Sequence, residues 1–524
     1  MKRAFCLLFI FISIFSFSQT KTKVVEVRYS GITSFDEEKY PGATILTRDA
    51  NRLVEIYHDG ALLFCDRAIF YKKKNFFNAF GNVLIKQGDT ITQKSDFVNY
   101  NGNTKEARSW GNVILQDSKM TMKTDTLHFD RQKQLLFYEH HAIMQDANNT
   151  LKSKVGNYYL ENKKFTATTK VVVTNPDHVL ASNHLDYYTD SSIAYLYGPS
   201  TITGKDNTVY TEKGFYNTKA EISHFVKNST IYFKDKTIKG DSLYYDQFKS
   251  FASATNNIKF IDTIQNLVVK GNYAESYELK DSVFIIDKAV AISLMDKDSM
   301  YTHGKKILVT GKPEKRIVRI YNDVKIFKSD LQGKCDSIHT NQTTGLTQMF
   351  KNPVLWSGKN QITGDFIQLL NNKETDKLDS LKILNNAFII QLDTIIDGVS
   401  TYNQIKGRNM YGKFVDGKLK HFLVKGNAEV VYYNRSETGV LETITKQEAS
   451  SIEFTLDENN EIESVKYIKK PEGTSYPPKD LPINARLLKG FIWREVEQPK
   501  KMEDIFGMGE TIPTIKSNIK NVKE

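Results

Sequence analysis

Hydrophobic and polar residues alternate along most of this chain in short segments. Ile258 and Phe260 flank Lys259, and Val324 and Ile326 flank Lys325 with the same spacing. Successive side chains of a strand point to opposite faces, so each segment would bury one face. Apolar spacings of three and four residues are nearly absent. The pattern therefore predicts an all-β protein with tight turns at pairs such as Asn101-Gly102, where positive φ is needed.

The segments repeat at a spacing of about thirty residues. The sequence of residues 81–85, GNVLI, recurs as GNVIL at residues 111–115, and looser copies follow to Gly426-Asn427. A second marker alternates with the first, an acidic residue before an apolar and aromatic strand, as at Asp96, Asp125 and Asp241. One such unit cannot close a core, but stacked neighbours can. We expect an elongated stack of about a dozen strand–turn–strand units, in which each Gly-Asn pair is a turn that leads into a strand.

The alternation also predicts which side chains face the interior. Those expected to point inward are Val83, Ile85, Val113, Leu115, Val171, Val173, Ile258, Phe260, Val324, Ile326, Val354 and Trp356. In one interpretation these side chains fill a dry core. In the other they line an apolar groove that holds acyl chains. Periodicity alone does not separate the two interpretations and by itself favours the filled core.

The first residues have the features of an export signal. Lys2 and Arg3 precede an apolar run from Ala4 to Phe17, and small residues stand before a cut at Gln19. The run is shorter than a bilayer span requires, which favours a cleaved signal over an uncleaved anchor. We therefore expect a periplasmic protein, with association with the outer membrane left open.

The predicted organisation has five parts. Residues 1–18 form the signal peptide, 22–260 and 261–430 the two halves of the repeat array, 431–505 an atypical C-terminal cap or docking region, and 506–524 a loosely ordered tail. Six of the 11 prolines lie from Pro471 onward, and residues 491–494, FIWR, form an aromatic strand or plug. A repeat array needs atypical ends that cover its open strand edges.

The net charge indicates the kind of partner, and the cysteine count indicates whether disulfides stabilise the fold. The formal net charge of +11 favours anionic partners. Export argues against nucleic acid, so an anionic lipid or polysaccharide fits better. Without Cys6 of the signal, Cys65 and Cys335 remain, too few for a disulfide framework.

Motifs for catalysis or metal binding are absent from the sequence. It has no Gly-rich phosphate loop, no metal-spaced Cys/His cluster and no nucleophile elbow. His140 and His141 are adjacent, so on a strand they would point to opposite faces. Asp365 and Asp376 are candidates for the acidic pair of a polysaccharide-active β-helix enzyme, but no motif around them supports that role. We predict no enzyme activity, no cofactor and no metal.

The repeat resembles the OstA-like (organic solvent tolerance) family, which includes LptA-type lipopolysaccharide-transport proteins and the N-terminal region of LptD-type translocons. The residues that carry the resemblance are Gly81-Asn82-Val83 and Gly111-Asn112-Val113, each followed by the strand that begins at Asp96 or Asp125. Two further stretches resemble the longer Bacteroidetes-type members: residues 272–300 and residues 476–493. The resemblance covers about residues 22–505.

This resemblance implies a β-jellyroll that passes lipopolysaccharide from the inner to the outer membrane. The lipid A acyl chains would lie in the apolar interior and the phosphates towards basic rims. End-to-end contact with other jellyroll transport proteins is then expected, and a homo-oligomer is left open. The alternatives are a non-catalytic scaffold in the envelope and, more remotely, the polysaccharide-active enzyme.

Overall fold

The computed structural model describes residues 23–294, 298–312, 315–375, 377–396, 399–457 and 462–507. The predicted signal peptide and most of the predicted tail lie outside these residues. The chain divides into two compact units, residues 1–192 and 193–524. Both are built from antiparallel strands, and the described residues contain no α-helix, only short 3-10 turns. The all-β prediction is confirmed.

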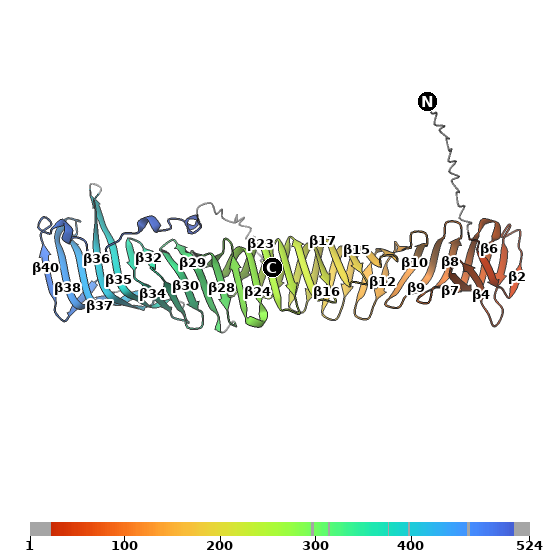
Figure 1. Cartoon of the computed structure of the whole chain (residues 1–524), viewed down its shortest axis with the longest axis horizontal. Coiled ribbons are helices and arrows are strands. Elements are labelled where there is room, and N and C mark those ends of the chain that lie inside the picture. Colours follow the sequence, from red (N-terminus) through yellow and green to blue (C-terminus); the bar gives the residue numbers. More distant parts are fainter. Residues whose placement is uncertain are drawn as a thin grey trace, which may run out of the picture. The chain divides into compact units, whose positions relative to one another are not determined.

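Unit 1 is a series of strands that follow one another along one axis (Figure 1). Its strands are β1 (Glu26–Tyr29), β2 (Ile32–Ser34), β3 (Thr44–Thr47), β4 (Val54–His58), β5 (Ala61–Cys65), β6 (Arg67–Tyr71), β7 (Phe76–Gln87), β8 (Ile91–Asn101), β9 (Glu106–Gln116), β10 (Thr121–Asp130), β11 (Leu135–Tyr138), β12 (Ala142–Gln145), β13 (Thr150–Ser153), β14 (Val155–Tyr159), β15 (Lys164–Thr174) and β16 (His178–Tyr188). The short turn η1 (Lys72–Lys74) joins β6 to β7.

Unit 2 continues the same strand pattern. Its strands are β17 (Ile193–Gly204), β18 (Asn207–Asn217), β19 (Ile222–Lys227), β20 (Ser229–Phe233), β21 (Lys236–Gly240), β22 (Ser242–Asp246), β23 (Phe251–Asp262), β24 (Leu267–Tyr277), β25 (Ser282–Ile286), β26 (Val290–Leu294), β27 (Ser299–His303), β28 (Lys306–Thr310), β29 (Ile317–Lys328), β30 (Leu331–Asn341), β31 (Leu346–Phe350), β32 (Val354–Ser357), β33 (Asn360–Thr363), β34 (Phe366–Asn371), β35 (Leu378–Ile396), β36 (Val399–Val415), β37 (Lys418–Arg435), β38 (Leu441–Leu456), β39 (Ile462–Ile468) and β40 (Glu472–Tyr476). Its 3-10 turns include η2 (Glu278–Lys280), η4 (Ile483–Ala485), η5 (Glu495–Glu497) and η6 (Met502–Ile505).

The unit boundary differs from the two predicted halves, which met at residue 260. Strands also continue past residue 430 as far as β40, so the jellyroll pattern extends into the predicted cap.

The Gly-Asn marker is a corner inside a continuous strand, not a turn before one. Gly81 and Asn82 lie within β7, with φ of 74° and 45°. Pairing between β7 and β8 shifts register across them, between Phe80 and Val83. Two successive residues in the left-handed region bend the strand sharply, as in a β-bulge. The turn predicted here is therefore corrected to a corner.

Each corner divides a long strand between two half-sheets. Residues 76–80 of β7 pair with β6, while its residues 84–87 pair with β5. We call the sheet that contains β5 and residues 83–87 half A, and the sheet that contains β6 and residues 76–80 half B. The chain passes from one half to the other at the corners. At the opposite side, which we call the mouth, hairpins such as 88–90 return within the same half.

The second sequence marker supplies a hydrogen bond to the first. Asn82 Nδ2 donates to Asp66 Oδ2 at 2.8 Å, and the Asp66 amide donates to the Gly81 carbonyl at 2.9 Å. The same side-chain bond joins Asn112 to Asp96 at 2.8 Å and Asn257 to Asp241 at 2.7 Å. The acidic residue thus lies at one corner, and its carboxylate accepts a hydrogen bond that stabilises the following corner.

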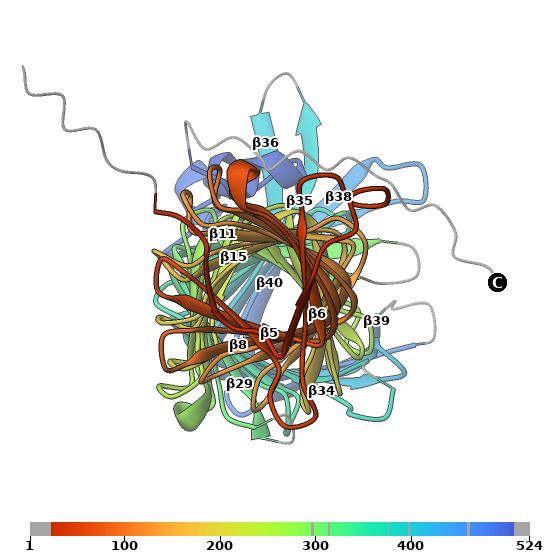
Figure 2. The same cartoon turned by 90° about the vertical axis from the view of Figure 1, so that its right-hand side faces the viewer.

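The hydrophobic core lies between the two halves. In unit 1 it combines Ile56 and Leu63 of half A with Phe77, Ala79 and Val98 of half B, all buried. Seen from its N-terminal end, unit 1 has its strands arranged around a common axis (Figure 2). The alternation in the sequence therefore corresponds to an inner apolar face on each half.

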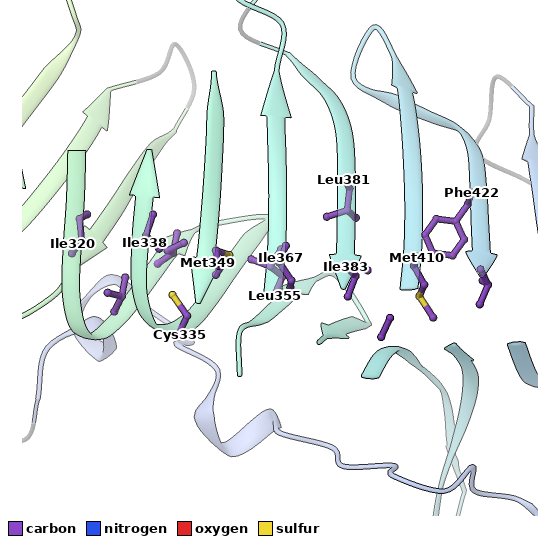
Figure 3. Packing of buried hydrophobic residues seen from close by; sticks show 14 of the residues in the cluster. Ile320, Cys335, Ile338, Met349, Leu355, Ile367, Leu381, Ile383, Met410 and Phe422 are labelled. Carbon is purple, nitrogen blue, oxygen red and sulfur yellow. The ribbon is translucent and has the colours of Figure 1, made fainter. Parts of the chain in front are cut away.

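In unit 2 the inner face forms an unbroken cross-strand row. Consecutive partners in this row are Ile320, Ile338, Met349, Ile367, Ile383, Met410, Val424 and Ile452. All eight side chains are buried, and Figure 3 labels the part of the row from Ile320 to Met410. Directly opposed apolar pairs of this kind stabilise sheets, so the row extends with every strand added.

We predict that the corner glycine at Gly111 cannot be replaced without strain. A Cβ there would lie 2.7 Å from Asp96 Oδ2 at a φ of +75°, whereas a Cβ at Gly88, with a φ of +60°, meets nothing within 4 Å. Gly88→Ala should cost about 1–2 kcal/mol from the left-handed backbone alone. Gly111→Ala should cost roughly 2 kcal/mol more through overpacking. Urea unfolding followed by circular dichroism would measure both. Equal midpoint shifts would contradict the corner model.

Candidate functional site

The predicted interior residues lie mainly on the inner face. Val83, Val113, Leu115, Val171, Ile258, Val324 and Ile326 are buried, and Ile85, Val173 and Phe260 are half-buried. Their register agrees with this placement, since Ile85 pairs with Leu63 and Val324 with Cys335, members of the two inner clusters. Whether these residues also contact a lipid remains a prediction.

Val354 and Trp356 are on the other face, so their predicted inward position is wrong. Leu355, between them, belongs to the inner cluster of unit 2. Trp356 pairs with Gln332 and Gln361, and cross-strand partners share a face. The thirty-residue spacing predicts Asn352-Pro353 as a copy of the Gly-Asn pair, but the left-handed pair is Lys351-Asn352. A slip of one residue exchanges the two faces of a strand.

A pocket opens between the halves in unit 1. Half A supplies Ile56, His58, Ala61, Leu62, Leu63, Ile85 and Gln87, and half B supplies Phe77, Val98, Tyr100, Ala107, Phe129 and Arg131. Its cavity volume is about 50 Å³. Most of the lining is apolar, with polar groups at His58, Tyr100 and Arg131.

Polar contacts cross the mouth above this pocket. Arg131 Nη2 donates to the Asp59 carbonyl at 2.7 Å, and Nη1 donates to the His58 carbonyl at 3.2 Å and the Tyr100 hydroxyl at 3.3 Å. The Lys105 ammonium pairs with the Asp59 carboxylate at 2.7 Å, and Lys23 pairs with the same carboxylate. These bonds hold the pKa of Asp59 well below its usual range. Arg131 and Lys105 are in hairpins of half B and Asp59 in a hairpin of half A, so the halves are tied together here.

In unit 2 we likewise call half A the sheet formed by the residues that follow each corner, such as 387–391 of β35. Its outer face is covered by the C-terminal segment, residues 477–506, which we call the strap. The strap runs back from β40 past β36 and β32 towards β29 (Figure 1). Leu481 and Leu488 are buried against Phe388, Ile390 and Val431. Near its end, Ile505 and Phe506 pack on Val268, Val290 and Ile292. The aromatic segment around Phe491 and Trp493 packs on Tyr402, with ring centroids 5.0 and 5.3 Å away.

Buried glutamines attach the strap to the sheet. Gln404 Nε2 donates to the Arg486 carbonyl at 2.8 Å, and its Oε1 accepts from the Leu488 amide at 2.9 Å. Gln361 binds the Ile492 carbonyl and the Arg494 amide in the same way, at 2.8 and 2.7 Å. Both glutamines are at most 1% exposed. Their amides satisfy backbone groups that would otherwise be buried without partners.

An ion cluster adds to this attachment. Glu497 accepts from Arg494 at 2.7 Å and pairs with Lys334 of β30 at 2.8 Å. These contacts, the one with Arg494 first, lower the pKa of Glu497 to about 2. The glutamines and this cluster were not found from the sequence, because isolated Gln and Glu residues carry no periodic signal.

Within the described residues, no group of three His, Cys, Asp or Glu side chains could hold a metal. His141 is at a corner, with a φ of 47°, and Asp365 accepts a corner hydrogen bond from Asn386 at 3.0 Å. Asp376 lies outside the described residues. Cys65 and Cys335 are buried free thiols, and burial raises the pKa of each to about 12.

No helix in the described part of the chain is long and apolar enough to cross a membrane.

An antiparallel repeat with corners along one side and an apolar interior between two half-sheets defines the class of β-jellyroll proteins. A family model described as "OstA-like protein" matches residues 21–183 and 165–241. This part of the chain therefore belongs to the OstA-like family, as its repeats suggested. The family is one of transport and binding proteins and is not known for enzymes. No curated protein gave a significant match.

We predict that Gln361→Leu loosens the strap. The change leaves the Ile492 carbonyl and the Arg494 amide without their partner, at about 1–3 kcal/mol per buried group. Trypsin should then cut at Arg494 several-fold faster, as measured by mass spectrometry of timed digests. Gln348→Leu, on the outer face of half B, is the matched control and should leave the rate unchanged. Equal protection of Arg494 in both variants would show that the glutamine does not hold the strap.

The strap should also loosen in acid. The pKa of Glu497 is about 2 in the folded state against an ordinary 4.5, so its contribution is complete above pH 4.5 and is lost as the pH falls towards 2. The side chain is 35% exposed, so solvent screening keeps the effect small. Hydrogen exchange of residues 490–500, corrected for intrinsic rates, should quicken between pH 5 and 3. In Glu497→Gln this extra dependence should disappear, whereas Glu503→Gln should retain it.

Proposed function

We propose that this protein is a periplasmic component that carries lipopolysaccharide from the inner to the outer membrane. The observation that carries the proposal is the apolar inner face that lies, within each unit, between two half-sheets joined at the corners. In this proposal acyl chains lie between the halves and leave through the mouth. Membership of the OstA-like family by residues 21–241 supports it.

The interior can exchange contacts between its own side chains for contacts with lipid at a small cost in free energy. An acyl chain between the halves would meet the same Val, Ile and Leu side chains that now meet one another. Burial of each methylene of an acyl chain contributes about 0.8 kcal/mol of favourable free energy. This gain offsets the free energy that is needed to separate the two halves. Because mouth hairpins return within one half, the halves can part there without breaking strand pairing.

A scaffold in the envelope is the second candidate, and the packing of unit 2 favours it. The inner row from Ile320 to Ile452 is at most 5% exposed. A core filled in this way would serve a structural solenoid equally well. The two functions differ in whether lipid ever enters between the halves.

The terminal strands support an end-to-end arrangement with other jellyrolls. In the described chain, β1 and β2 pair along one edge only, with β4 and β3, and β39 and β40 both pair with β38. An unpaired edge can accept a strand of another protein. We therefore propose the jellyroll domains of the inner- and outer-membrane transport complexes as partners.

Photo-crosslinking in living cells tests the route. A crosslinking amino acid at Val83, Val113, Ile258 or Val324 should capture lipopolysaccharide. Leu355 and Trp356 form a matched pair on one strand: we expect lipid capture at the inward Leu355 and capture of the strap at the outward Trp356. Leu84 is the corresponding outward control in unit 1. Capture at outward positions alone would rule out the interior route.

Depletion of the protein is the functional test. The proposal expects lipopolysaccharide to accumulate at the inner membrane, measured after separation of the two membranes. Unchanged lipopolysaccharide distribution together with a weakened envelope would favour the scaffold.

A further inference from the structure

The strap satisfies two basic side chains that it covers. Lys325 and Lys334 are cross-strand partners on the outer face of half A in unit 2. The Lys325 ammonium donates to the Asp504 carbonyl of the strap at 3.3 Å. The Lys334 ammonium pairs with the Glu497 carboxylate at 2.8 Å. This face therefore already binds one extended peptide, through main-chain and carboxylate oxygens that meet its lysines.

The same cross-strand row continues past the end of the strap. It passes from Lys325 through His303 and Val290, and the ring of His303 is 4.9 Å from that of Phe506. Phe506 packs on Val290 near the end of the strap. Beyond Val290 the row consists of three lysines on adjacent strands, which we call the lysine row: Lys270 of β24, Lys259 of β23 and Lys239 of β21.

The lysine row lacks the partners that the strap gives to Lys325 and Lys334. In the part of the chain that the structure describes, no hydrogen bond or ion pair reaches any of its three ammonium groups. The carboxylates of Asp241 and Asp287, at the neighbouring corners, accept from corner asparagines at 2.7 and 3.1 Å. Like charges directly opposite each other destabilise a sheet. The row therefore presents three adjacent cations without a compensating anion.

Lys270 is the buried member of this row. Its side chain is only 8% exposed. Burial, and next the charge of Lys259, lower the pKa of Lys270. A charge held out of water without a partner is costly, and a bound carboxylate would offset that cost. The site is thus a shaped part of the sheet face, and its unpaired cation points to an anionic ligand.

We infer that the lysine row binds an extended acidic segment of a partner protein, which lies across the strands in continuation of the strap. Adjacent strands are about 4.8 Å apart, so the three lysines span roughly 10 Å. An extended peptide advances about 3.3 Å per residue, so four residues with alternating carboxylates cover the row. The strap provides the precedent for the path, and the charge of the row selects the ligand. The inference goes beyond the proposed function and holds equally for a lipid carrier and for a scaffold.

Fluorescence anisotropy with the full-length protein tests the inference. The probe is a labelled, capped heptapeptide in which Glu alternates with Thr, and its neutral counterpart has Gln in place of each Glu. Wild-type protein should bind the acidic peptide at least tenfold more tightly at low ionic strength, because charge-assisted hydrogen bonds are stronger than neutral ones. The difference should shrink as salt is added, since salt screens exposed charges.

Two lysine variants locate the binding site. Lys270→Met should lower the affinity for the acidic peptide about tenfold. Its melting temperature should not fall, because Met keeps the apolar stem and removes an unpaired buried charge. The matched control is Lys382→Met, an exposed lysine on the outer face of half B that pairs across strands with Gln368 and Tyr411. It should leave the affinity unchanged, and an unchanged affinity in Lys270→Met would overturn the inference.

Two other occupants are distinguished by the same assay. Glu510 is the first carboxylate after the strap, which makes the chain's own last residues a competitor for the row. A tenfold gain in peptide affinity in Glu510→Gln would show that the row is filled from within the chain and would overturn the inference. Displacement of the acidic peptide by inorganic phosphate at an equal concentration of charge would also overturn it, since the row would then bind any anion.

Discussion

The corner, at which one or two residues adopt positive φ, is the constraint on which both units depend. It lets one strand belong to both half-sheets, so each added strand lengthens the two halves together and keeps them in register. The side-chain hydrogen bond from Asn82 to Asp66 connects one corner to the one before it, and the same bond recurs at Asn112 and Asn257. Without the corner, the chain would form a flat ribbon with one apolar face exposed to water.

The corner also explains which parts of the sequence pattern are strict and which are loose. Gly and Asn reach positive φ at least cost, and so they mark the clearest copies. Thr169-Lys170 and Lys469-Lys470 adopt the same conformation. The surrounding strand pairs must compensate for their strain. Copies of the motif therefore fade in the sequence while the corner itself persists.

The sequence was sufficient for the fold class and for most inward positions, because both follow from local alternation and repetition. It failed at Val354 and Trp356, where Pro353 was aligned with the second corner residue. The left-handed pair there is Lys351-Asn352, one residue earlier than the repeat spacing indicates. The strap and the Arg131 contacts were beyond sequence reasoning, since they join residues such as Gln361 and Arg494 that are far apart in the chain. Their partners follow from the completed fold.

Buried hydroxyls interrupt the apolar interior near the start of unit 2, yet they need not interrupt a lipid path. Ser200, Thr211 and Ser229 are at most 2% exposed. The Thr211 hydroxyl lies 3.1 Å from that of Ser229 and donates to the Lys213 carbonyl at 2.9 Å, and the Ser200 hydroxyl donates to the Gly198 carbonyl at 3.0 Å. A hydroxyl bonded within the protein presents mainly its carbon atoms to a neighbour, and it would lose no water when an acyl chain lies beside it. These positions therefore keep the interior permissive for apolar contact.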